Sequence, residues 1–344
     1  MKNKICILSY ENIYFNGNSF FCDNIDMKSI PEGLSLNNEI KLIARNSEKK
    51  RSKSINISNI KVHKNLAKYL IEVIKTIKDK DFKYFAISLT PQTFLSIIIL
   101  KLFGKKVFLY LRSDGFKEYN IIFGTFGKFI YGIMFSISSI FSNLVACRQH
   151  LLRNRKGIIV NPSQLNQNWF KEIKETTTDD IRLLYVGRMR KEKGIFSLID
   201  ILKNKSDFNL ENINSEKDTT NQLHSNISVI SFENYNDEII KYYDKCNIFI
   251  LPSYTEAHPQ VLDEALARLR PVIVFNEIQH VTRNRNGVFV CDRNFDSLEK
   301  TCKHILTNYK DIQTKMRENI LPTKDIFLKE LENILKKLKK TKRV

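Results

Sequence analysis

The chain has 344 residues, of which 42% are hydrophobic and 11% aromatic, enough for two buried cores and unlike a disordered or fibrous protein. Its six cysteines form no C-x-x-C pair and no Cys/His cluster of zinc spacing, which suits a reduced compartment. The first residues carry too short an apolar run for a signal peptide, so we expect a cytoplasmic protein.

The net charge of +19 is concentrated in the first half of the chain. Residues 1–160 hold 26 Lys and Arg against 11 Asp and Glu, whereas residues 161–344 hold 30 against 26. Such a field favours an anionic partner: phospholipid headgroups, nucleic acid or a phosphorylated substrate. The alternative is that these lysines are only a solvated surface.

Short apolar runs alternate with helix-like segments in residues 1–162, which predicts a parallel sheet with crossover helices. We expect helices at Val62–Ile77 and Thr93–Phe103, and a loop at Ile43–Ile60. The expected strands are Lys4–Leu8, Tyr84–Ser88, Lys106–Leu111, Leu144–Cys147 and Gly157–Val160.

Phe129–Cys147 runs without a charge for nearly the length of a membrane span. It contains several serines, however, and its last residues resemble a separate strand. We therefore expect a buried or interfacial helix followed by a strand, with a membrane span as the less favoured alternative.

The second half repeats the alternation of strands and helices after a polar stretch, so we divide the chain into residues 1–162, a linker at 163–180, a second α/β domain at 181–322, and a helix with a basic tail at 323–344. The expected strands are Arg182–Val186, Ile227–Ser231, Ile248–Leu251, Pro271–Phe275 and Gly287–Cys291. The expected helices are Gly194–Leu202, Asp237–Lys245, Pro259–Ala267, Asp296–Tyr309 and Ile326–Leu338.

The most informative segment is Asn247–Phe275, in which a strand, a loop with Glu256 and a helix with Glu264 follow one another. In open α/β sheets, ligands bind beyond the carboxyl ends of strands, where helix N-termini offer N–H groups. Amides around Ala257–Leu262 could hold a phosphate while the carboxylates accept hydrogen bonds from sugar hydroxyls. The alternative is an ordinary amphipathic helix with a solvated glutamate.

A second segment, residues 183–200, places Gly187, Arg188, Lys193 and Gly194 between a strand and a helix. Both cations would reach the same sheet edge as Glu256 and could neutralise a diphosphate without a metal. The alternative is a loop that is basic because it is exposed.

Together the patterns G-R-x-x-x-x-K-G at Gly187–Gly194, P-S-x-x-E-x-x-P-x-x-x-x-E-A at Pro252–Ala265 and R-P-V-I at Arg270–Ile273 resemble the retaining family 4 glycosyltransferases. The resemblance implies the GT-B fold: two Rossmann-like α/β domains with parallel sheets facing a central cleft. It covers the second half in order and spacing, but the first half in architecture only.

The resemblance also implies roles for individual residues. Glu264 would hold the ribose hydroxyls, Arg188 and Lys193 the diphosphate, and Glu256 the donor sugar. The full implied donor site is Gly187, Arg188, Lys193, Glu256, Ala257, His258, Gln260, Val261, Leu262 and Glu264.

The chain departs from the family pattern in two places. Ala257 and His258 stand where the family has Gly after the first Glu, which leaves the shape of this loop and the choice of donor open. His258 could contact the donor or act as a polar residue at the helix start. The glycine-rich loop expected near the N-terminus is reduced to Gly17.

The acceptor side must come from the first half. After the strand that ends at Leu111 come Arg112, Asp114 and Lys117. We expect Asp114 to face the reacting sugar as a catalytic residue beside Glu256, Arg188 and Lys193, with Arg112 and Lys117 near an anionic acceptor. The alternative for Asp114 is a turn residue bonded to local backbone.

The function that the resemblance implies is retaining sugar transfer, without metal or cofactor, from a nucleotide sugar. We expect the acceptor to be a glycan or lipid-linked intermediate of a cell-surface polysaccharide (lipopolysaccharide, capsule or O-antigen type). The basic first half, the apolar Ile121–Phe141 region and the basic C-terminal tail predict peripheral docking on an anionic inner membrane. The alternatives are a catalytically silent GT-B subunit and a nucleic-acid-binding protein; the latter lacks a binding motif, and we expect no nucleic-acid partner.

Overall fold

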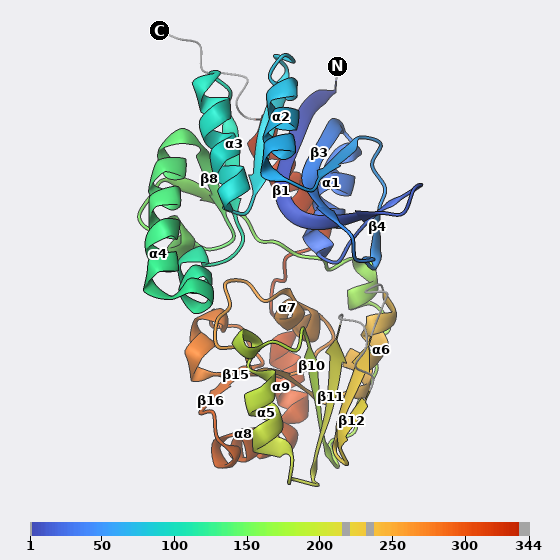
Figure 1. Ribbon diagram of the computed structural model, residues 1–344. Coiled ribbons are helices and arrows are strands. Elements are labelled where there is room, and N and C mark those ends of the chain that lie inside the picture. The colour runs from blue at the N-terminus through green and yellow to red at the C-terminus, as the bar shows by residue number, and fades with distance from the viewer. Residues whose placement is uncertain (1, 215–220, 232–236, 337–344) are drawn as a thin grey trace. The chain divides into compact units, whose positions relative to one another are not determined.

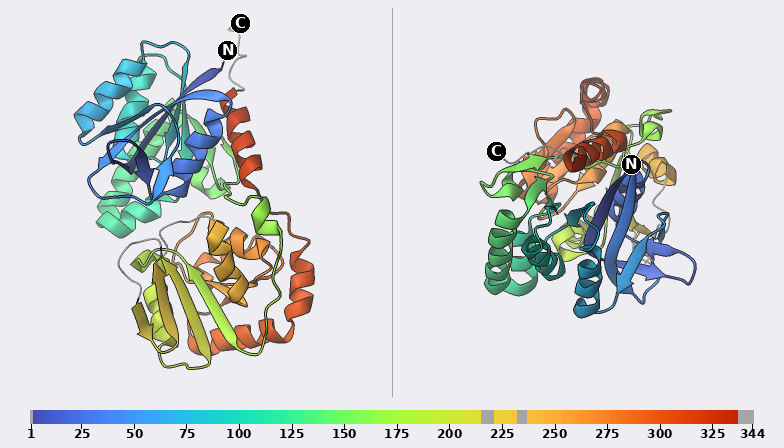
Figure 2. Two further views of the ribbon diagram at one scale, coloured as in Figure 1. Left: turned by 90° about the vertical axis from the view of Figure 1, so that its right-hand side faces the viewer. Right: turned by 90° about the horizontal axis from the view of Figure 1, so that it is seen from above.

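The computed structural model describes residues 2–214, 221–231 and 237–336, and in this part of the chain it forms two compact α/β units (Figures 1 and 2). The first unit comprises Met1–Pro162 together with Asp325–Val344, and the second comprises Ser163–Lys324.

The first unit is built on a mainly parallel sheet in the order β4-β2-β1-β6-β7-β8-β9, with β3 and β5 added beside β1. Only β2 pairs antiparallel, with β1 and β4. Its elements are β1 (Asn3–Phe15), β2 (Phe20–Cys22), α1 (Ile25–Ser35), β3 (Asn38–Ser47), β4 (Lys53–Ile55), β5 (Ile60–His63), α2 (Leu66–Thr76), β6 (Phe82–Ile87), α3 (Pro91–Leu102), β7 (Val107–Leu111), α4 (Gly115–Phe141), β8 (Asn143–Ala146), η1 (Gln149–Leu152), β9 (Gly157–Ile159) and α10 (Lys324–Lys336).

The second unit has a sheet in the order β12-β13-β11-β10-β14-β15-β16, parallel except for β12. Its core is continuous through the sheet and the helices that cover it. Its elements are η2 (Gln167–Phe170), β10 (Ile181–Val186), η3 (Lys191–Lys193), α5 (Ile195–Leu202), β11 (Phe208–Asn214), β12 (Asn221–His224), β13 (Ile227–Ser231), η4 (Asp237–Ile239), α6 (Ile240–Lys245), β14 (Ile248–Leu251), α7 (Gln260–Ala267), β15 (Val272–Phe275), η5 (Asn276–Val281), β16 (Val288–Cys291), α8 (Phe295–Thr307) and α9 (Tyr309–Met316).

The loop predicted at Ile43–Ile60 is wrong, because β3 continues to Ser47 and β4 and β5 follow. Charged residues on β3 interrupt the apolar pattern by which a strand is predicted. The Lys41 ammonium, for example, lies 2.7 Å from the Glu72 carboxylate while apolar neighbours on β3 are buried. The helix predicted from Val62 begins only at Leu66, since the Asn65 side chain caps it by accepting from the Lys68 N–H.

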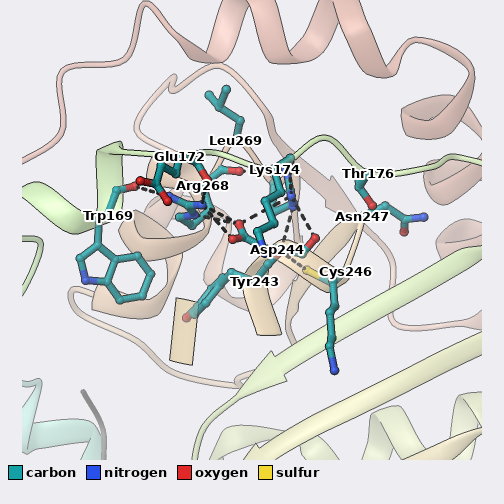
Figure 3. A network of polar contacts seen from close by, with 12 residues as sticks. Trp169, Glu172, Lys174, Thr176, Tyr243, Asp244, Cys246, Asn247, Arg268 and Leu269 are labelled. Carbon is teal, nitrogen blue, oxygen red and sulfur yellow. Dashed lines mark hydrogen bonds and ion pairs between the residues drawn. The ribbon is translucent and has the colours of Figure 1, made fainter. Parts of the chain in front are cut away.

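The segment predicted as a linker, residues 163–180, belongs to the second unit. The Trp169 side chain is buried in the core of the second unit (Figure 3). Two arginines at and just after the end of α7 donate hydrogen bonds to the backbone of residues 169–174. Arg268 donates to the carbonyl oxygens of Trp169, Lys171 and Glu172, and Arg270 to that of Lys174. Composition marked this stretch as polar but could not reveal that buried arginines bind its carbonyls.

Asp244 on α6 forms ion pairs with both of these arginines. Its carboxylate accepts two hydrogen bonds from Arg268, both at 2.9 Å. Because Arg268 is only 1% exposed, this ion pair is shielded from water and each partner depends on the other.

The helix predicted at Ile326–Leu338 runs from Lys324 to Lys336 as α10, and the basic tail beyond it lies outside the described residues. This helix packs on the first unit: the buried Phe327 ring lies 6.3 Å from that of Tyr110 on β7. Asn37 and Asn38 donate to the Glu332 carboxylate, both at 3.2 Å. Helix α10 thus completes the first unit rather than the second.

Phe129–Cys147 forms the end of α4 followed by β8, as the sequence predicted. Among the described residues α4 is the one helix long and apolar enough to cross a bilayer, by length and composition, but only 28% of its most apolar stretch is buried. It is interrupted at Gly124, which has φ 66° and ψ −159°, a conformation essentially restricted to glycine.

Candidate functional site

The loops that follow β10 and β14 meet at one edge of the second sheet. These strands are parallel neighbours, with Leu183 beside Ile248, so their carboxyl ends point the same way. The backbone N–H of Tyr254 donates to the Glu192 carbonyl at 3.0 Å. Gly194 has φ +65°, and a Cβ there would stand 1.9 Å from the Pro252 oxygen. Only glycine permits this approach, so Gly194 locks the two loops together.

Two side chains from these loops hold the carboxylate of Glu256. The Lys193 ammonium lies 2.6 Å from Glu256 Oε1, and the Ser253 hydroxyl donates to the same oxygen at 2.8 Å. The lysine and the glutamate are both mostly buried. The structure therefore joins the basic motif to the first glutamate of the second motif, as their shared sheet edge predicted.

Arg188 follows the end of β10 and, unlike Lys193, is not paired with a carboxylate in the described part of the chain. It is exposed, and its guanidinium makes no ion pair or hydrogen bond with any residue the structure describes. Its backbone is fixed, since the Tyr185 hydroxyl donates to the Arg188 carbonyl at 3.1 Å, and a Cβ at Gly187 would meet that hydroxyl at 2.3 Å. A fixed backbone and an unpaired guanidinium suit the binding of a phosphate oxygen pair.

Glu264 lies in the second turn of α7 and is only 2% exposed. The Tyr243 hydroxyl on α6 donates to Glu264 Oε2 at 2.7 Å. The alternative interpretation, a solvated glutamate on an ordinary amphipathic helix, is therefore wrong for Glu264. Its predicted contact with ribose stays a prediction, and any such contact would involve a carboxylate already oriented by Tyr243.

The two residues that depart from the family pattern are both largely buried. Ala257 is not among the residues of positive φ in the described chain, so this position does not require glycine. The imidazole of His258 is 1% exposed; its Nδ1 lies 2.8 Å from a guanidinium nitrogen of Arg283, and its Nε2 lies 3.2 Å from an Asp263 oxygen. Asp263 also pairs with Arg285. His258 thus belongs to a buried polar cluster at the start of α7.

Of the amides predicted to bind phosphate, those around Ala257–Leu262, the amides of Gln260, Val261 and Leu262 lie in the first turn of α7. The Leu262 N–H donates to the Pro259 carbonyl at 3.2 Å, so this amide is already used within the turn. For the amides of Gln260 and Val261, which precede Leu262 in this turn, a phosphate-binding role stays a prediction.

Three nearby residues were not predicted: Ser253, Tyr243 and Arg293. Ser253 is part of the P-S-x-x-E pattern, which could have indicated it. Arg293 follows β16 at the same sheet edge, and its guanidinium lies 4.0 Å from the Tyr254 ring centre and 2.8 Å from the Glu277 carboxylate. The hydrogen bond from Arg293 lowers the pKa of Glu277. Arg293 and Tyr243 lie outside the motifs, so no sequence signal marked them.

In the first unit, Asp114 caps α4. Its carboxylate accepts from the N–H groups of Phe116 and Lys117, and the Arg153 guanidinium lies 3.2 Å away. These contacts favour the turn interpretation, and the catalytic role of Asp114 stays a prediction. Lys117 itself is exposed.

Arg112 lies within an acidic pocket of the same sheet edge. Its guanidinium is 3.4 Å from Asp26 and 3.7 Å from Glu11, and it donates to the Asn24 side chain at 3.3 Å. Burial opposes the charged form, but these carboxylates outweigh it and raise the pKa of Arg112. The predicted acceptor role of Arg112 is untested, and its charge is already shared with two carboxylates.

Among the described residues no group of three or more His, Cys, Asp or Glu side chains could hold a metal ion. Metal independence nevertheless stays a prediction, since it concerns the reaction.

The part of the chain that carries this site is similar in sequence to a known family. Residues 166–321 match the family described as glycosyl transferases group 1, and the match contains both loops of the site. The match covers most of the second unit and less than half of the chain. TuaC of Bacillus subtilis (strain 168), named as a teichuronic acid biosynthesis glycosyltransferase, is 30% identical over 120 residues, which cover 34% of this chain and 31% of TuaC. The chain spans between 31% and 60% of the length of the curated relatives it matches.

Solved structures show that the fold is GT-B. The sucrose-phosphate synthase of Thermosynechococcus elongatus has a TM-score of 0.72 at 14% identity, over 98% of this chain and 99% of that one. WaaG, a glycosyltransferase involved in lipopolysaccharide biosynthesis, has a TM-score of 0.66 at 15% identity, over 96% of this chain and 100% of WaaG. The α/β class and the GT-B fold predicted from the sequence are confirmed.

Proposed function

We propose that this protein is a group 1 glycosyltransferase, and that it transfers a sugar, with retention of configuration, from a nucleotide-sugar donor to a glycan or lipid-linked acceptor. The observation that carries the proposal is the cluster at the carboxyl edge of the second sheet. There Lys193 and Ser253 orient the Glu256 carboxylate, and Arg188, on a fixed backbone, offers a guanidinium that is unpaired among the described residues.

The cluster provides what a departing diphosphate requires. Negative charge develops on the phosphate oxygens as the sugar leaves, and preoriented cations stabilise it without a metal. The Arg188 guanidinium can bind two oxygens at once, while Lys193 supplies a second positive charge 2.6 Å from Glu256. Because Lys193 is bound to Glu256, the anion site and the expected sugar site are coupled.

Retention can proceed without a strong protein base. The acceptor can approach the same face of the donor sugar from which the diphosphate departs. An oxygen of the departing diphosphate can then take the proton of the acceptor hydroxyl. The enzyme then contributes orientation and charge stabilisation. On this account Arg188 contributes more to the rate than Asp114, which is already bound to Arg153 and its own helix.

For the acceptor we propose an intermediate of a cell-surface polysaccharide, of the lipopolysaccharide, capsule or O-antigen type. This rests on relatives named for teichuronic acid and lipopolysaccharide biosynthesis. We also propose that the enzyme works in the cytoplasm as a peripheral protein on an anionic inner-membrane surface, since the basic charge is concentrated in residues 1–160.

A second candidate is a GT-B subunit that binds nucleotide but transfers no sugar. The observation in its favour is His258, whose buried contacts with Asp263 and Arg283 occupy the loop between the two glutamates. The two candidates differ in turnover and agree in nucleotide binding.

The deciding experiment incubates the purified protein with radiolabelled nucleotide sugars, membrane extract as acceptor source, and EDTA. Transfer of label into glycan or lipid, abolished in Arg188→Ala and retained in Lys191→Ala, supports the enzyme. Nucleotide binding without transfer or donor hydrolysis supports the silent subunit. An inverted anomeric carbon in the product, detected by NMR, would contradict retention.

A further inference from the structure

Helix α4 is folded back on itself at Gly124. Phe116 and Phe135 would lie about 28 Å apart along a straight helix, yet their ring centres are 5.5 Å apart. The Tyr119 and Tyr131 rings likewise lie 5.0 Å apart. The two parts of α4 therefore pack against each other as a helical hairpin, and Gly124 lies at its tip.

One face of the longer arm of this hairpin is buried in the first unit. Gly127, Tyr131, Met134, Phe135 and Ser138 recur at helical spacing and are buried. A helix that packs one whole face on its own domain cannot also be surrounded by lipid. This packing argues against a membrane span, even though α4 is long and apolar enough for one.

The opposite face and the tip are apolar and exposed. Phe126, Phe129, Ile133 and Ile140 are spaced by three, four and seven residues, which places them on one stripe away from the buried face. Phe126 is 71% exposed. We call the following seven exposed residues the apolar ridge: Ile121, Ile122, Phe123, Phe126, Phe129, Ile133 and Ile140.

Positive charge accompanies the ridge. Lys128 lies exposed between two of its phenylalanines, and Lys117 is exposed near the start of α4. The Arg153 guanidinium stacks on the Phe116 ring at 4.7 Å, which brings the exposed segment with Arg155 and Lys156 beside the hairpin. Exposed apolar side chains edged by cations match a bilayer with anionic headgroups, which offers hydrocarbon below a negative surface.

We infer that the apolar ridge of α4 inserts into the headgroup and acyl boundary of an anionic bilayer, with α4 lying in the membrane surface. The inference deepens the proposed peripheral attachment and rests on it. The hairpin begins at Asp114, beside Arg112 and the carboxyl edge of the first sheet. Insertion of its tip therefore brings that edge close to the bilayer, where a lipid-linked acceptor would present its headgroup.

The test labels an introduced cysteine with an environment-sensitive NBD dye at Phe126→Cys, with Leu36→Cys as the matched control. Leu36 is 75% exposed and lies outside the ridge. The native thiols will label poorly, because they are buried and burial raises their pKa, to about 12 for Cys147 and Cys291.

With phosphatidylglycerol-containing vesicles, the dye at position 126 should brighten and shift to the blue, and that at position 36 should not change. Spin-labelled lipids should quench it more strongly from near the glycerol backbone than from the acyl-chain end. Binding of the protein with no change at position 126 would overturn insertion. Stronger quenching from the chain end would overturn the surface orientation. A change that rises with protein concentration in the absence of lipid would show that a second copy covers the ridge, and would also overturn the inference.

A variant with Phe126→Ser and Phe129→Ser should bind these vesicles at least about tenfold more weakly, while Leu36→Ser should bind as the unchanged protein does. Nucleotide-induced stabilisation in solution should persist in both variants. Loss of vesicle binding therefore tests the ridge, and loss of nucleotide binding tests the proposed enzyme, so the two can fail separately. Equal vesicle affinity of the serine variant and the unchanged protein would contradict the inference.

Discussion

The two units carry polar loops at the carboxyl edges of parallel sheets, but they use their charges differently. In the second unit Arg188 is unpaired among the described residues, although its backbone is fixed. In the first unit Arg112 is shared between Asp26 and Glu11, and Asp114 is bound to Arg153. The comparison indicates that the edge of the second sheet has a cation available for an anion, whereas Arg112 and Asp114 at the edge of the first sheet are already paired within the fold.

The largest expected effect in the second unit is on stability, from Arg268→Ala. This change leaves the buried Asp244 carboxylate dependent on the more distant Arg270, 3.8 Å away, and frees three carbonyl groups, which should cost about 3–5 kcal/mol. Urea denaturation should show the loss. Arg268→Lys should recover only part of it, because an ammonium cannot reproduce the planar contacts of the guanidinium. A loss below about 1 kcal/mol would mean that segment 163–180 is not fastened as described.

Arg188→Ala should lower kcat/KM by roughly 100-fold or more without lowering the melting temperature. The side chain is exposed and forms no hydrogen bond or ion pair with a described residue, so its removal costs little folding energy. Steady-state kinetics with a nucleotide-sugar donor measures the effect, and Lys191→Ala on the same loop is the control. If both variants lose activity equally, general positive charge rather than the geometry of Arg188 is what matters.

The sequence predicts those parts of each unit that are marked by a motif or by a regular apolar pattern. Arg188, Lys193 and Glu256 are linked by motif spacing, and parallel strands bring their loops to one edge, so the cluster could be predicted. The partner of Glu264 could not, because Tyr243 lies 21 residues away on another helix. In the first unit, β3 was missed because Lys41 and Arg45 interrupt its apolar pattern.

Tyr243→Phe tests whether the buried carboxylate of Glu264 serves the donor site. It removes the hydroxyl that donates to Glu264 and should weaken nucleoside diphosphate binding by about tenfold, as expected for a hydrogen bond to a charged group. Isothermal titration measures this affinity. Tyr309→Phe is the control, because its buried hydroxyl donates to the Asn247 carbonyl at 2.8 Å. The control should lose stability only, and equal affinities in both variants would separate Glu264 from nucleotide binding.

The smallest expected effect belongs to the first unit. Asp114→Ala removes the cap of α4 and should cost about 1 kcal/mol of stability, with kcat/KM changed by less than about threefold, a difference under 1 kcal/mol. Denaturation and kinetics on the same preparation measure both. A large loss of activity at unchanged stability would make Asp114 catalytic and would reverse the contrast between the two units.

The most direct test of the central claim is thermal unfolding with UDP, GDP, CDP, ADP and TDP, comparing the unchanged protein with Arg188→Ala and Glu264→Gln. A nucleotide at about 100 times its dissociation constant adds roughly 2.7 kcal/mol and raises the midpoint by several degrees. We predict that one nucleotide stabilises the unchanged protein and that both variants lose most of this shift. If no nucleotide stabilises the unchanged protein, or if the variants respond fully, the second sheet edge is not a nucleotide-sugar site.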